Sequence, residues 1–154
     1  MINQTHTFQS EIVINAPRRE VFSFFSKAEN LEKLTPNWLQ FKILTNLPIE
    51  IKKGSLIDYR LKFYGIPIKW KTEITLWDPP SRFIDTQLKG PYKTWIHEHR
   101  FIDMNDCTKM IDSVTYQAPG GLFSSIIVKL FVKNSVNKIF DFRSRIIKQT
   151  FNHK

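Results

Sequence analysis

The chain has a single cysteine, Cys107, among its 154 residues. One thiol excludes an intramolecular disulfide and a metal site built from several cysteines, and it is typical of a reducing compartment. No uninterrupted apolar run approaches the roughly 20 residues that a membrane-spanning helix needs, and the start shows no basic segment followed by an apolar one. We therefore expect a cytoplasmic protein.

Glycine is also scarce, with five residues, and all five fall in expected turns. The sequence has no glycine-rich loop for phosphates, no serine-nucleophile motif and no close cysteine–histidine pair. These absences remove the usual sequence signals of nucleotide-binding and covalent-nucleophile enzymes. Enzymatic activity is therefore not the first expectation.

Acidic residues are few: 14 Asp and Glu face 23 Lys and Arg, so the formal net charge is +9. A basic surface attracts polyanions. The lysines are scattered along the chain, however, which is typical of a solvated surface. We expect no specific nucleic-acid partner and at most transient contact with an anionic membrane. A basic docking surface is the alternative, formed by Lys129, Lys133, Lys138, Arg143, Arg145 and Lys148.

What the chain does have is enough apolar sequence, 42% of residues, for one folded domain over residues 1–154. Alternation predicts a first strand over Thr7–Asn15. Asn15 is a candidate cap for a short helix with Pro17 in its first turn, and a second short helix is expected over Glu29–Leu34.

Strand-like runs then follow one another with short turns between them, which predicts an antiparallel meander. The runs are Phe41–Asn46, Ser55–Phe63, Ile68–Trp77, Arg82–Leu88, Tyr92–Asp103 and Thr108–Gln117. After residue 121 the apolar period changes to that of a helix, expected from Leu122 to about Thr150 and on the order of 40 Å long. This helix could span the whole sheet.

The most informative segment is the strand expected after Gly90-Pro91. Side chains alternate in a strand, so Trp95, His97, His99 and Phe101 share one face. If Asn105-Asp106 is a two-residue hairpin turn, opposed pairs are His99 with Asp112, His97 with Val114 and Trp95 with Tyr116. A three-residue loop over residues 90–92 would bring Asp85 and Gln87 to this face, and a two-residue loop would not.

The order of elements resembles the START-like (SRPBCC, helix-grip) superfamily, and several motifs resemble a bacterial ligand-binding subgroup related to polyketide cyclase/dehydrase-like proteins. Asn15-Ala16-Pro17 after the first strand belongs to the superfamily resemblance. The subgroup motifs are Phe83-Ile84-Asp85-Thr86-Gln87, Gly90-Pro91-Tyr92, Trp95-Ile96-His97-Glu98-His99-Arg100-Phe101, Asp112-Ser113-Val114-Thr115-Tyr116 and Pro119-Gly120-Gly121. The resemblance implies an α+β helix-grip fold. In it a seven-stranded antiparallel sheet curls around a long C-terminal helix, with two short helices after the first strand and a deep hydrophobic cavity. It implies no particular reaction, because members bind, transport or convert ligands.

Four roles are open for the polar face. The histidines could be neutral core residues paired with Asp112 or Asp85, or they could orient a ligand headgroup at the end of an apolar cavity. His97, His99 and Asp112 could also be the acid–base groups of a cyclase- or hydrolase-type enzyme. A metal is conceivable on His-x-His plus a carboxylate, but without a third histidine nearby we expect no metal and no cofactor.

Our leading hypothesis is therefore a non-enzymatic domain that binds a small hydrophobic or amphipathic molecule. The candidate ligand-binding residues are Tyr59, Trp70, Asp85, Gln87, Trp95, His97, His99, Asp112, Tyr116, Phe123 and Ile127.

Overall fold

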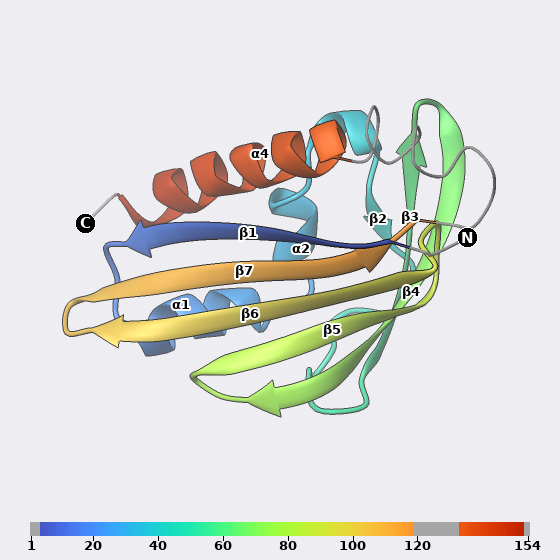
Figure 1. Cartoon of the computed structure of the whole chain (residues 1–154). Coiled ribbons are helices and arrows are strands. Elements are labelled where there is room, and N and C mark those ends of the chain that lie inside the picture. The colour runs from blue at the N-terminus through green and yellow to red at the C-terminus, as the bar shows by residue number, and fades with distance from the viewer. Residues whose placement is uncertain (1–3, 119–132, 153–154) are drawn as a thin grey trace.

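The computed structural model describes residues 4–118 and 133–152. The described residues form one seven-stranded sheet and three α-helices (Figure 1). In chain order the elements are β1 (Thr5–Ile14), α1 (Arg18–Phe25), α2 (Asn30–Lys33), a 3-10 turn (Asn37–Leu39), β2 (Lys42–Ile43), β3 (Leu56–Phe63), β4 (Ile66–Asp78), β5 (Arg82–Lys89), β6 (Thr94–Met104), β7 (Cys107–Gln117) and α4 (Lys133–Phe151).

Every strand pairs antiparallel with its neighbours, in the order β1-β7-β6-β5-β4-β3-β2. The sheet curves, and α4 runs along it (Figure 1). Residues of α1 and α4 share a core cluster with inward side chains of the strands, so both helices pack on the same face of the sheet. The expected helix-grip fold, with two short helices between the first two strands, is confirmed. Among the helices of the described residues, none is long and apolar enough to cross a membrane.

Two tight turns set the registers of the central hairpins. Asn105, with φ of 67°, lies in the turn between β6 and β7, and Met104 pairs with Cys107 as expected. Tyr64 and Gly65 both have positive φ, 49° and 78°, which is typical of the two-residue turn that suits the twist of a hairpin. The turn expected over residues 64–67 is therefore shorter, and Pro67 lies inside β4. Because β4 pairs with β5 only from Lys71 onward, Pro67 has a neighbour on one side only and its missing N–H is tolerated.

Two expectations need correction, and a third falls outside the described residues. Asn15 does not cap α1: Pro17 is the N-cap residue, without a side-chain hydrogen bond, and Asn15 instead accepts a weak bond from the Cys107 thiol at 3.5 Å. The strand expected over Phe41–Asn46 is only the two-residue β2, because the chain there pairs with β3 and then leaves the sheet. Residues 119–132, with Phe123 and Ile127, lie outside the described part.

Aromatic side chains dominate the core between α1 and the sheet. Phe22 of α1 meets the rings of Phe83 and Phe101 edge to face, at centroid separations of 6.0 and 5.3 Å. Phe101 is 2% exposed, and it follows His99 by two residues on the inward face of β6. The same strand thus supplies a ring to the core and two imidazoles farther along.

We expect Phe101→Ala to lower the free energy of unfolding by about 3–5 kcal/mol, because it removes a fully buried ring and leaves a cavity. Ile102→Ala is the matched control, since Ile102 lies on the opposite face of β6 and is 44% exposed; its effect should stay within about 0.5 kcal/mol. Urea denaturation of both variants measures the difference. Equal losses would contradict the assignment of faces along β6.

Candidate functional site

A cavity of about 350 Å³ lies between the inner face of the sheet and the helices. Its volume falls within the usual range of small-molecule sites, and most of its lining is apolar. Six of the candidate residues line it: Tyr59, Trp70, Asp85, Trp95, His97 and His99. Apolar side chains of α4, including Val136 and Phe140, close the opposite side.

Three other candidate residues do not line this cavity. Asp85 pairs with His97, as the longer of the two expected loops requires, so Gln87 lies on the expected face. Its amide, however, hydrogen-bonds the backbone of Tyr92 and so stabilises the turn between β5 and β6. Tyr116 packs against Trp95 with tilted rings, whose centroids are 5.9 Å apart. Asp112 lies behind the histidines, away from the cavity lining.

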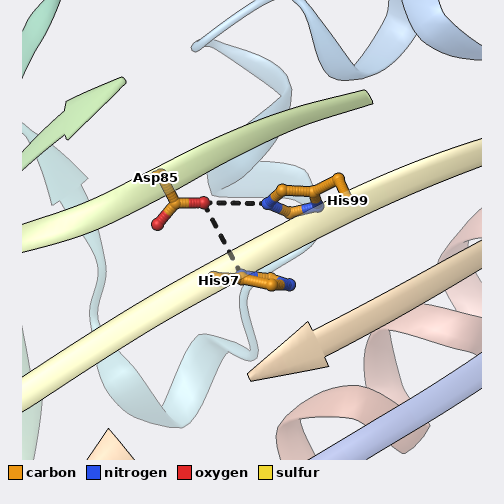
Figure 2. A group of neighbouring side chains, drawn as sticks. All are labelled: Asp85, His97 and His99. Carbon is orange, nitrogen blue, oxygen red and sulfur yellow. Dashed lines mark hydrogen bonds and ion pairs between the residues drawn. The ribbon is translucent and has the colours of Figure 1, made fainter. Parts of the chain in front are cut away.

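Asp85 of β5 and His97 and His99 of β6 form a polar wall of the cavity on its sheet side. Figure 2 shows the two imidazoles side by side, both directed at the same carboxylate oxygen of Asp85. His99 Nε2 is 2.8 Å from Asp85 Oδ2, and His97 Nδ1 is 3.7 Å from it. The strand register explains this arrangement, because Asp85 is the cross-strand partner of His97 and the two histidines are two residues apart.

Behind this wall, Asp112 of β7 contacts both rings through one oxygen. His97 Nε2 hydrogen-bonds Asp112 Oδ1 at 2.9 Å. His99 Nδ1 is equally close to that atom, but the angle is too poor for a hydrogen bond, so this contact is electrostatic. Arg143 of α4 approaches the same oxygen with Nη2 at 3.8 Å. We call these five residues, Asp85, His97, His99, Asp112 and Arg143, the buried charged cluster.

Arg143 is only 7% exposed, although the sequence placed it on a possible basic docking surface. This expectation is wrong: the guanidinium lies 5.6 Å from the ring centroids of both Phe25 and Phe140 and faces Asp112. A sequence signal for this exists. The inward residues of α4 are Val136, Phe140, Arg143, Ile147 and Phe151, so Arg143 occupies an apolar position of the helix, where a charge implies a buried partner.

The pKa values of the cluster reflect burial set against charge. Burial favours the neutral acid of Asp112, but the charge of Arg143, the hydrogen bond from His97 and the contact with His99 outweigh it and hold the pKa of Asp112 well below its usual range. The pKa of Asp85 is lowered in the same way, with the histidines overcoming burial. The cluster therefore keeps two ionised carboxylates in the protein interior.

The two imidazoles are pushed in opposite directions. Burial and then the charge of His99 lower the pKa of His97, despite the two carboxylates. Burial also opposes protonation of His99, but its contacts with Asp112 and Asp85 outweigh this and raise the pKa of His99. With His99 protonated and His97 neutral, the positive charges of His99 and Arg143 balance the two carboxylates.

Comparison with known proteins identifies the family. A family model described as polyketide cyclase / dehydrase and lipid transport matches residues 14–142, well over half of the chain. The chain belongs to this family. No curated protein sequence matches it significantly.

Solved structures confirm that this family member has the START-like fold. The Zhui aromatase/cyclase of a Streptomyces species superposes with a TM-score of 0.76 at 12% identity, covering 97% of this chain and 94% of the other. A START superfamily protein from Mycobacterium smegmatis gives 0.70 at 11% identity, covering 94% and 99%. Norcoclaurine synthase from Thalictrum flavum gives 0.69 at 15% identity, covering 97% and 98%. At these identities the likeness concerns the fold alone.

We expect Arg143→Leu to lower the free energy of unfolding by about 3–5 kcal/mol, because it leaves Asp112 as a buried carboxylate without its guanidinium. Arg145→Leu is the matched control on the same helix, since Arg145 is exposed and faces away from the cluster; it should change stability by no more than about 0.5 kcal/mol. Thermal and urea unfolding of the two variants provide the comparison. Similar values for both would argue against a buried role for Arg143.

Proposed function

We propose that this domain binds a small molecule that is mostly apolar and carries one polar group. The observation that carries the proposal is the cavity itself, whose lining is mostly apolar and whose buried ionisable groups include Asp85, His97 and His99 on the sheet and Arg143 on α4. Sites for small amphipathic ligands combine these two features, because apolar walls provide affinity and a few polar groups fix orientation.

The polar group of the ligand is inferred from donors that lack partners. Among the described residues that line the cavity, three buried nitrogens lack a hydrogen-bond partner: Trp70 Nε1, Arg143 Nε and His99 Nδ1, of which the last lies against Asp112. An unsatisfied buried donor costs about 1–3 kcal/mol, so a ligand that supplies an acceptor gains that energy on binding. A carbonyl or carboxylate oxygen meets this requirement.

The comparisons support this proposal without choosing a ligand. The family description covers both cyclisation or dehydration and lipid transport, and two of the similar folds belong to an aromatase/cyclase and a synthase. An enzyme that uses His97, His99 and Asp112 as acid–base groups therefore stays a prediction. In that case Asp112 would act through the histidines, since it does not line the cavity. Contact with an anionic membrane also stays a prediction.

Native mass spectrometry of protein purified from its own host tests the proposal directly. We expect a retained apolar molecule at one copy per chain. A fluorescent apolar probe, 1-anilinonaphthalene-8-sulfonate, then measures binding to the emptied folded protein. Leu61→Trp should weaken probe binding at least about tenfold, because Leu61 lines the cavity on β3 and the larger ring fills it.

Leu56→Trp is the matched control for this experiment. Leu56 belongs to the same strand but lies on its other face and is 46% exposed, so probe affinity should not change. A probe that binds Leu61→Trp as tightly as the unmodified protein would refute binding in this cavity. Absence of any retained molecule together with no probe binding would refute the proposed function.

A further inference from the structure

We propose that Asp85, His97 and His99 form a binding site for one divalent first-row transition-metal ion, such as Zn²⁺, on the polar wall of the cavity. Each residue offers one ligand atom, and the three atoms lie within 4.8 Å of one another. Two imidazole nitrogens and one carboxylate oxygen are a donor set that suits zinc and the neighbouring metals.

The distances fit a common ion. With zinc bonds of about 2.0–2.1 Å and tetrahedral angles, ligand atoms lie about 3.3 Å apart. The observed separations from Asp85 Oδ2, 2.8 Å to His99 Nε2 and 3.7 Å to His97 Nδ1, fall on either side of that value. The third separation, between the two imidazole nitrogens, is within 4.8 Å, so the rings have to turn toward a common point to hold the ion.

The far side of the His97 ring is arranged as metal-binding histidines require. A histidine that binds a metal usually directs its other ring nitrogen at a carboxylate or carbonyl, which fixes the tautomer and orients the ring. Here His97 Nε2 donates to Asp112 Oδ1 at 2.9 Å, and this leaves the lone pair of Nδ1 facing Asp85. His99 Nδ1 lies 2.9 Å from the same oxygen without a hydrogen bond, so Asp112 contacts this second ring electrostatically.

The remaining coordination positions face the cavity. All three ligand residues line it, whereas Asp112 stands behind them and is 4% exposed. An ion here would have three protein ligands on one side and a free coordination position toward the cavity, as in zinc sites that accept an exogenous ligand. A carbonyl or carboxylate oxygen on the bound molecule could fill an open position.

The test is a titration of ZnCl₂ into the full-length protein after treatment with EDTA, followed by isothermal calorimetry. We expect one ion per chain. His97→Ala and Asp85→Ala each remove a ligand and should weaken binding by more than about 100-fold, whereas Asp112→Asn should weaken it about 10- to 100-fold, as loss of an outer hydrogen-bond partner does. His6→Ala is the matched control, since His6 stacks on Tyr116 outside the cluster, and it should bind as the unmodified protein does.

The unmodified protein provides a second readout that does not depend on any variant folding. Co²⁺ in the site should give the intense visible absorption of a four- or five-coordinate ion, and Zn²⁺ should abolish it. Weak absorption typical of hydrated, octahedral Co²⁺ would overturn the proposal. So would zinc affinity that is the same in the folded His97→Ala and His6→Ala variants. The proposal does not rest on the proposed function: a protein that binds the apolar probe but no metal would overturn only the metal site.

Discussion

Compensation of buried charge is the constraint on which the rest of this structure depends. Asp112 and Arg143 are both over nine-tenths buried, and neither carboxylate nor guanidinium is tolerated in an interior without partners. The two histidines and Asp85 complete the balance, so that removal of any member leaves another group uncompensated. The cluster therefore ties α4 to β7, β6 and β5, across the width of the sheet that forms the cavity.

This arrangement separates the interior into two chemical regions along one strand. Phe101 of β6 packs with the rings of α1, while His99 and His97 lead from that core toward the cavity. Phe83 bridges the two regions, since its ring stacks on His99 at a centroid separation of 4.2 Å and also meets Phe22. The aromatic core thus holds the imidazoles in fixed orientations, which a site that orients a ligand requires.

Some features were predictable because they depend on local rules. Alternation along β6 and the two-residue turn at Asn105 together specify which residues of β6 and β7 face one another, and the observed pairs of His99 with Asp112 and of Trp95 with Tyr116 are the expected ones. The prediction that Asn15 caps α1 was wrong for a local reason as well, because Pro17 already provides the extended residue before the helix. Gln87 shows that alternation predicts the face of a residue but not its contacts. It shares the face of Asp85, but its amide donates a hydrogen bond to the backbone of the turn.

The sequence alone determined the order of elements, the two faces of β6 and the register of its hairpin with β7, since period-two alternation and turn chemistry act over a few residues. Only the tertiary structure decided that Asp85 meets both histidines, because the sequence did not specify the length of the loop between β5 and β6, and this length determines the face on which Asp85 lies. It also decided that Arg143 is buried, because a helix position acquires its environment from whatever strand it packs against. The cavity belongs to the same category, since an enclosed volume exists only once the sheet has curved and α4 lies across it.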